Sequence, residues 1–127
     1  MMTQRFQVYR CQICGTMVKV VSVGRGTLVC CGQPMKLLDE KQQDSGKEKH
    51  VPVIEKKAQG IRVVVGATPH PMEDRHFIEW IEVRSGPFCA VRSLKPGEKP
   101  MAEFSLTDPA VKIRAYCTVH GLWTSQG

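Results

Sequence analysis

The chain is poor in aromatic side chains and has no long apolar run, and both shortages limit what it can be. Aromatic residues make up 6% of the 127 residues, against 42% for apolar residues as a whole. No stretch approaches the roughly 18 uninterrupted apolar residues that would suggest a membrane span. The opening MMTQRFQVYR has no apolar run after its basic residues, so we expect no secretory signal. The sequence therefore predicts a cytoplasmic protein that does not associate with membranes.

Runs of basic residues interleaved with aromatics are also missing. The formal net charge is +6, from 18 Lys and Arg against 12 Asp and Glu. Such an excess can favour nucleic acid, an acidic protein partner or a small anionic substrate. Because the basic residues are spread along the chain, we expect no nucleic-acid binding.

A helical period is absent, whereas short strand-like runs separated by Gly and Pro are frequent. Several short strands spaced about ten residues apart favour an all-β fold, with a β-sandwich in the second part of the chain. In the run FIEWIEV, the alternation predicts Ile78 and Trp80 on one face of a strand, with Ile81 and Val83 on the other. Cys89, inside the apolar run PFCAV, is expected to be a buried small hydrophobic residue.

Composition divides the chain into three zones. Residues 1–38 hold four of the six cysteines, residues 39–49 contain no large apolar side chain, and residues 50–127 hold the longer strand signals. We therefore predict a small N-terminal module, a solvated connector and a larger β domain. A module of this size cannot bury enough apolar surface to fold alone, so it needs a metal or disulfides.

Four sulfurs in the N-terminal module have the spacing of a metal site. Cys11 and Cys14 form a C-x-x-C pair, the usual bite of two thiolates on one tetrahedral ion. Cys30 and Cys31 would complete the set, but both can reach one ion only if the backbone bends, which Gly32 makes feasible. A disulfide between neighbouring cysteines would be strained. The spacing predicts a four-thiolate metal site and leaves zinc and iron both open.

Histidine is absent from the N-terminal module, and all four histidines follow the connector. They occupy the stretches EKHVP, TPHPMEDRH and YCTVHG, as His50, His70, His76 and His120. A single histidine is usually a satisfied surface or core residue, but Cys117 and His120 have the spacing of a ligand pair at a turn. Imidazole and thiolate together suit iron, copper or zinc. Five such ligands are too many for a structural zinc, whereas an iron that prefers six would keep one position open for substrate.

These motifs resemble the desulfoferrodoxins, the two-iron class of superoxide reductases, along nearly the whole chain. The resemblance is carried by the C-x-x-C pair, the adjacent cysteines, EKHVP, HPMEDRH and CTVHGLW. It implies a small rubredoxin- or desulforedoxin-like module with one iron, followed by an immunoglobulin-like β-sandwich whose iron has four equatorial histidines and one axial cysteine. The implied ligands are Cys11, Cys14, Cys30 and Cys31 for the first iron, and His50, His70, His76, His120 and the axial Cys117 for the second.

The same resemblance implies an enzyme that reduces superoxide to hydrogen peroxide by one electron, in defence against oxidative stress. Lys49, next to the implied ligand His50, would attract the anion to the open position. Glu48 resembles the family glutamate that closes onto oxidised iron after turnover. Rubredoxin is the implied electron donor, and a homodimer is the implied assembly.

Two other classes of function fit part of the sequence. A zinc ribbon attached to a β-sandwich binding module would explain the four clustered cysteines, but it leaves the histidines and Cys117 without a purpose. A simple electron carrier that uses only the first iron would ignore the same ligands. Colour separates these possibilities, because a zinc protein is colourless whereas ferric thiolate sites absorb visible light.

Overall fold

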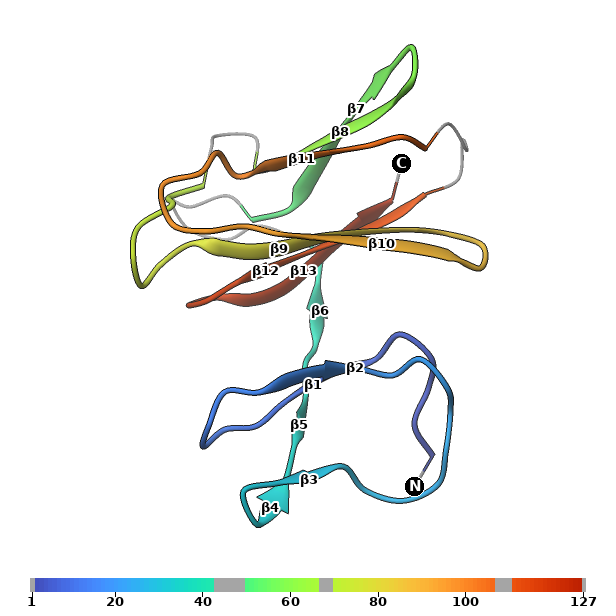
Figure 1. The fold of residues 1–127 in the computed structure, drawn as a ribbon, viewed down its shortest axis with the longest axis vertical. Helices are drawn as coiled ribbons and strands as arrows, with labels where there is room; N and C mark the ends of the chain where they lie inside the picture. Colours follow the sequence, from blue (N-terminus) through green and yellow to red (C-terminus); the bar gives the residue numbers. More distant parts are fainter. Residues whose placement is uncertain (1, 43–49, 67–69, 107–110, 127) are drawn as a thin grey trace. The chain divides into compact units, whose positions relative to one another are not determined.

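The computed structural model describes residues 2–42, 50–66, 70–106 and 111–126 (Figure 1). The chain divides into two compact units, Met1–Asp39 and Glu40–Gly127, which we call the N-terminal unit and the C-terminal unit. The described residues form thirteen strands and no helix, which confirms the all-β prediction. In this part of the chain, accordingly, no helix has the length and apolar character needed to cross a membrane.

The N-terminal unit consists of short strands joined by tight turns. In chain order its strands are Val8–Arg10 (β1), Met17–Lys19 (β2), Val29–Cys30 (β3), Gln33–Pro34 (β4) and Lys36–Leu37 (β5). The central strand β1 pairs antiparallel with β2 and with β5, while β3 and β4 form a separate hairpin. Its described residues bury few apolar side chains, namely Val8, Cys11 and Val20. So small a core is consistent with a unit that depends on a metal for its stability.

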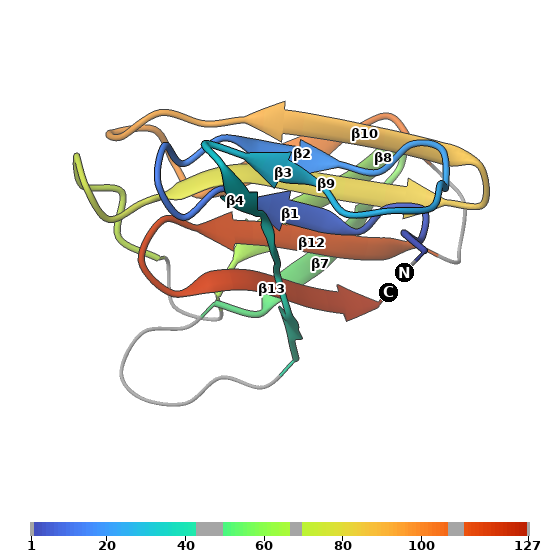
Figure 2. The ribbon, with the colours of Figure 1, turned by 90° about the horizontal axis from the view of Figure 1, so that it is seen from below.

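The C-terminal unit is a sandwich of two sheets. Its strands are Glu40–Lys41 (β6), Pro52–Lys57 (β7), Gly60–Val65 (β8), Ile78–Ser85 (β9), Phe88–Ser93 (β10), Met101–Phe104 (β11), Lys112–Cys117 (β12) and Gly121–Gln126 (β13). One sheet has the order β10-β9-β12-β13-β6, and Figure 2 shows its four longer strands side by side. The other sheet has the order β11-β8-β7. All neighbouring strands are antiparallel except β13 and β6, which are parallel.

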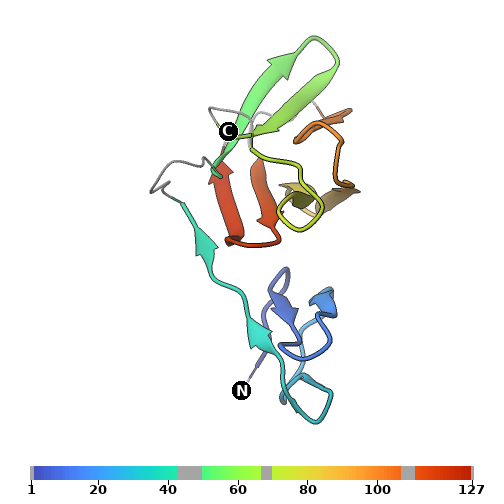
Figure 3. The same ribbon diagram turned by 90° about the vertical axis from the view of Figure 1, so that its left-hand side faces the viewer.

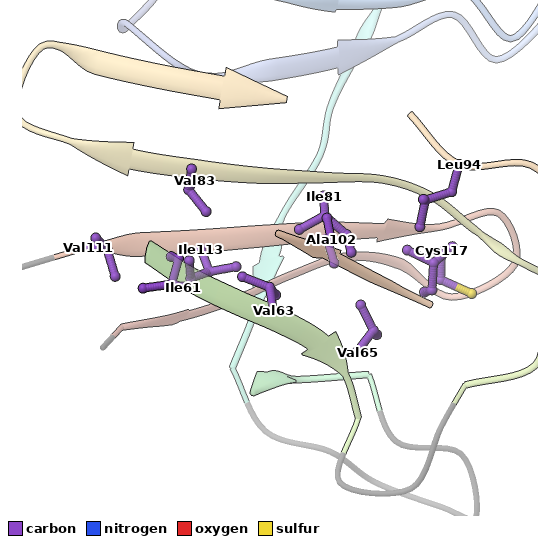
Figure 4. Packing of buried hydrophobic residues seen from close by; sticks show 12 residues of the cluster. Ile61, Val63, Val65, Ile81, Val83, Leu94, Ala102, Val111, Ile113 and Cys117 are labelled. Atoms are coloured by element: carbon purple, nitrogen blue, oxygen red, sulfur yellow. The ribbon is translucent and has the colours of Figure 1, made fainter. Parts of the chain in front are cut away.

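Aliphatic side chains from both sheets form the core between them. Every second residue of a strand points to the same face, and the sequence supplies apolar residues at that period. The buried residues are Ile61, Val63 and Val65 of β8, Ile81 and Val83 of β9, and Ile113, Ala115 and Cys117 of β12. Figure 4 shows Cys117 at the end of this cluster opposite Val111. Cys117, one of the predicted metal ligands, is therefore itself part of the core.

A β-bulge in β9 changes the face on which its first residue lies. Tyr116 pairs with Trp80, but the next residue, Cys117, pairs with Ile78, so Glu79 is the extra residue of a bulge. The bulge places Ile78 in the core, while Trp80 stays on the other face, where its ring stacks on that of Tyr116 at 6.0 Å. The prediction that Ile78 and Trp80 share a face is therefore wrong.

The two edges of the five-stranded sheet also differ from the sequence-based picture. Cys89 on β10 is only partly buried, because β10 is an edge strand; the prediction of full burial is wrong. At the opposite edge, Glu40 and Lys41 form β6 within the stretch expected to be a connector. They pair with Leu122 and Trp123 of β13. In Figure 3, β6 is the cyan strand that follows β5 along the chain.

Candidate metal centres

The first cluster consists of four sulfurs from two turns of the N-terminal unit. The ligand atoms of Cys11, Cys14, Cys30 and Cys31 all lie within 4.8 Å of one another. The Sγ of Cys30 lies 3.6 Å from that of Cys14 and 4.0 Å from that of Cys31. Four thiolates at about 2.3 Å from one tetrahedral ion would be about 3.8 Å apart. The cluster therefore has the dimensions of a four-thiolate metal site.

A tight turn explains why two adjacent cysteines can serve one ion. Cys31 and Gly32 are the two residues between the paired Cys30 and Gln33. Their φ angles are 54° and 78°. A two-residue hairpin of type I′ requires positive φ at both positions. The bend predicted from the adjacent cysteines is thus the turn between β3 and β4.

Hydrogen bonds give the four thiols different acidities. The Thr16 hydroxyl, 3.1 Å from the Cys14 sulfur, lowers the pKa of Cys14 to about 6. The backbone N–H of Cys14 lowers the pKa of Cys11. In contrast, the nearby Cys14 sulfur raises the pKa of Cys30 to about 12 and raises that of Cys31. A cation bound among the four sulfurs would favour the thiolate form of each and displace the protons that remain.

The second cluster gathers five side chains at one end of the sandwich. His50 precedes β7, His70 follows β8, His76 precedes β9, Cys117 ends β12, and His120 lies in the turn to β13. Because the paired strands of each sheet are antiparallel, the strand ends that carry these residues meet at the same end of the sandwich. The ligand atoms of the five residues all lie within 4.8 Å of one another.

The four imidazoles of this cluster form a closed ring of edge contacts. The centroids of His50 and His70 lie 4.6 Å apart, and those of His70 and His76 lie 4.9 Å apart. The ring closes through His120, at 5.2 Å from His76 and 4.8 Å from His50. The Nε2 of His50 is 3.1 Å from the Nδ1 of His120. Nitrogens at about 2.1 Å from one ion and at right angles would be about 3.0 Å apart, so the ring fits a square of ligands.

Cys117 adds a thiol to this ring from the interior of the protein. Its Sγ lies 3.4 Å from the Nε2 of His70 and 3.8 Å from the Nδ1 of His120. It also accepts the backbone N–H of His120 at 3.4 Å. Cys117, His50 and His70 are buried, whereas His120 is exposed, so the cluster reaches solvent on the side of His120. A small anion can therefore approach the cluster without entering the core.

Neighbours outside the ligand set orient the imidazoles. The Nδ1–H of His70 donates to the carbonyl of Pro71 at 2.7 Å, which leaves Nε2 as the ligand atom. The Trp123 ring stacks on His50, with centroids 4.6 Å apart and planes inclined by 12°. Its indole N–H donates to the carbonyl of His120 at 3.2 Å. Sequence reasoning assigned no role to Trp123, although this residue ends the motif CTVHGLW.

Thr118 fixes the loop that carries His76. Its Oγ1 accepts the backbone N–H of Phe77 at 3.1 Å and donates to the carbonyl of Arg75 at 3.1 Å. The backbone N–H of Thr118 also donates to the carbonyl of Phe77 at 3.0 Å. The residues on both sides of His76 are thereby held to the turn that carries His120. No feature of the sequence predicts this contact, since a threonine in a turn is commonplace.

The structure places all nine predicted ligand side chains in the two clusters. Lys49 and Glu48, the other predicted site residues, lie outside the described residues. Cys89, the remaining cysteine, belongs to neither cluster.

Comparison with known proteins agrees with this pair of sites. The chain matches the family model "Desulfoferrodoxin, N-terminal domain" over residues 3–38 and the model "Desulfoferrodoxin" over residues 42–126. A desulfoferrodoxin homolog of Archaeoglobus fulgidus is 55% identical over 124 residues, covering 98% of this chain and 99% of the relative. A superoxide reductase of Thermococcus kodakarensis is 34% identical over 108 residues, covering 68% of this chain and 91% of the relative.

A solved structure supports the fold over almost the full length. The crystal structure of the superoxide reductase from Treponema pallidum matches with a TM-score of 0.77 at 20% identity, covering 97% of this chain and 99% of that chain. The ranges matched by the two family models contain all the motifs singled out from the sequence, and the relative from Archaeoglobus fulgidus matches over almost the full chain. The chain belongs to the desulfoferrodoxin family.

Proposed function

We propose that this protein reduces superoxide to hydrogen peroxide at an iron held by the second cluster. The observation that supports this most directly is the closed ring of four imidazoles joined by one buried thiol, with all ligand atoms within 4.8 Å. Five donors leave one position of a six-coordinate ion free for a small anion. The proposed ligands are His50, His70, His76, His120 and Cys117.

In the overall reaction, superoxide takes up one electron and two protons and leaves as hydrogen peroxide. When bound in its ferrous form, iron supplies the electron and an open coordination position. The four imidazoles would hold the ion, and Cys117 would provide an anionic sulfur, which favours loss of the electron. Because this sulfur is fully buried and accepts the N–H of His120, it is kept away from water and in a fixed orientation.

The two residues before His50 in the chain, Glu48 and Lys49, are proposed to act at the second cluster. Lys49 would attract superoxide electrostatically and help to stabilise the negative charge of the product. Glu48 would bind the oxidised centre after turnover and leave again on reduction. These roles are supported by the resemblance of EKHVP to the family motif and by the net charge of +6, which favours an anionic substrate.

The first cluster would hold the other iron, on Cys11, Cys14, Cys30 and Cys31. We propose a small electron-donor protein such as rubredoxin as the source of electrons, a homodimer as the assembly, and the cytoplasm as the compartment. The compartment is supported by the sequence, in which four cysteines have the spacing of a metal site rather than of a disulfide framework, as is usual where thiols are kept reduced.

Metal analysis of protein purified without added metal, combined with a superoxide-consumption assay, tests the proposed function. We expect two irons per chain, visible colour and consumption of superoxide by the reduced protein. A colourless zinc protein without activity would instead support a zinc ribbon attached to a binding domain. Iron on the four cysteines alone, without superoxide consumption, would support an electron carrier.

A further inference from the structure

Lys41 is an exposed residue of β6 whose side chain ends beside the second cluster. Its Nζ donates to the carbonyl oxygen of His120 at 2.9 Å and lies 5.2 Å from the centre of the Trp123 ring. The same carbonyl accepts the indole N–H of Trp123 at 3.2 Å. Two donors, one of them charged, therefore fix this oxygen.

These contacts connect the Lys41 ammonium to three of the proposed iron ligands. The carbonyl that it binds belongs to His120, whose backbone N–H donates to the sulfur of Cys117. The Trp123 ring beneath the ammonium is stacked on His50. A displacement of the Lys41 side chain would therefore shift the turn that carries His120 and the Trp123 ring that packs on His50.

The other residue of β6 anchors the strand that presents Lys41. The Oε1 of Glu40 lies 3.5 Å from the Nζ of Lys112 and 3.9 Å from the Nη1 of Arg114. Successive side chains of a strand point to opposite faces, so Lys41 is directed away from these partners. The parallel register with β13 then pairs Lys41 with Trp123. The sheet itself thus positions the ammonium at the site.

We propose that Lys41 is a positioning residue of the second metal centre. Its ammonium holds the His120 turn and the Trp123 ring, and thereby the orientation of two imidazoles. Its positive charge also favours the reduced state of the bound ion, because an additional cation destabilises the more highly charged oxidised state. This inference rests on the proposed function only in taking the ion to be redox-active iron.

The test compares three variants of the iron-loaded, full-length protein: Lys41→Met, Lys41→Arg and Lys56→Met. Two quantities are measured without superoxide: the midpoint potential of the second centre, by spectroelectrochemical titration, and the rate at which a chelator removes its iron. We expect Lys41→Met to lower the potential and to accelerate iron release about tenfold, the lower end of the effect of outer-shell partners on metal affinity. Lys41→Arg, which keeps the charge and the hydrogen-bond donor, should keep the midpoint potential and the iron-release rate at the parent values.

Lys56→Met is the matched control, since it removes the same charge from an exposed residue of β7. It should leave the potential and the release rate at the parent values. Parent values in Lys41→Met would overturn the inference, and so would equal shifts in Lys41→Met and Lys56→Met. Superoxide consumption by the parent protein is measured separately, so a failure of the proposed function is distinguishable from a failure of this inference.

Discussion

The N-terminal unit should lose its fold when its four-cysteine site is broken, while the C-terminal unit keeps its fold and its metal. Besides the ligand Cys11, the buried apolar side chains described in this unit are Val8 and Val20. Burying the two valines contributes at most about 6 kcal/mol together. For comparison, structural zinc in zinc-finger peptides supplies about 10–16 kcal/mol at pH 7. The metal should therefore stabilise this unit more than its apolar core does.

Replacing Cys30 by Ser removes one of the four sulfurs, which lies 3.6 Å from the sulfur of Cys14 and 4.0 Å from that of Cys31. We expect iron content to fall from two to one per chain, with the remaining iron still able to react with superoxide. Amide hydrogen exchange, followed by NMR or mass spectrometry, shows whether each unit remains folded. Amides in the β1–β2 pairing should exchange at rates close to those of an unfolded chain, whereas those of β9 and β12 should keep their protection.

The matched control is Cys89→Ser, because Cys89 lies outside both clusters. This variant should retain both irons and the parent exchange pattern. Parent-level protection of β1 and β2 in Cys30→Ser without the first metal would refute the metal-dependent fold of the N-terminal unit. Loss of both irons in Cys30→Ser would refute the independence of the two sites.

The remaining substitutions concern the C-terminal unit. Cys117→Ser removes the thiolate of the second site and should abolish its ferric absorption band and superoxide reduction; a parent-like reaction rate would contradict the axial assignment. Glu82 and Arg114 are 0% and 2% exposed and form a bidentate pair of 2.7 and 2.8 Å. Glu82→Leu leaves a buried guanidinium without its main partner and should lower the free energy of unfolding by about 3–5 kcal/mol. Denaturant titration checks this value, and combining the change with Arg114→Met should recover much of the loss. Lys49→Ala should slow the encounter with superoxide and flatten its salt dependence in pulse radiolysis, since salt screens the attraction. Glu48→Ala should leave that encounter nearly unchanged and alter the ferric spectrum after turnover. An unchanged rate and salt slope in Lys49→Ala would make Lys49 an ordinary solvated charge.

The metal clusters could be predicted from the sequence because their chemistry depends on residue type and local spacing. The adjacent pair Cys30 and Cys31 demanded a bend, and a following Gly32 is what a two-residue turn with positive φ favours. The four histidines and Cys117, which has ligand spacing to His120, were left for a second site. Antiparallel pairing brings the strand ends that carry them to one end of the sandwich.

Features that depend on pairing between distant strands could not be predicted. The alternation in β9 looked regular, and only its register with β12 reveals the bulge at Glu79 that turns Ile78 into the core. Lys41 looked like one charge among many in a polar connector. Its contact with His120, 79 residues further along the chain, exists only because β6 joins the sheet beside β13.

The ratio of hydrogen peroxide formed to superoxide consumed tests the central claim most directly. The measurement uses pre-reduced protein in excess over superoxide, with oxygen evolution followed at the same time. Because each superoxide takes its electron from the protein, we predict one peroxide for every superoxide consumed and no oxygen release. One peroxide for every two superoxides, with oxygen evolved, would indicate dismutation and would contradict reduction at the second metal centre.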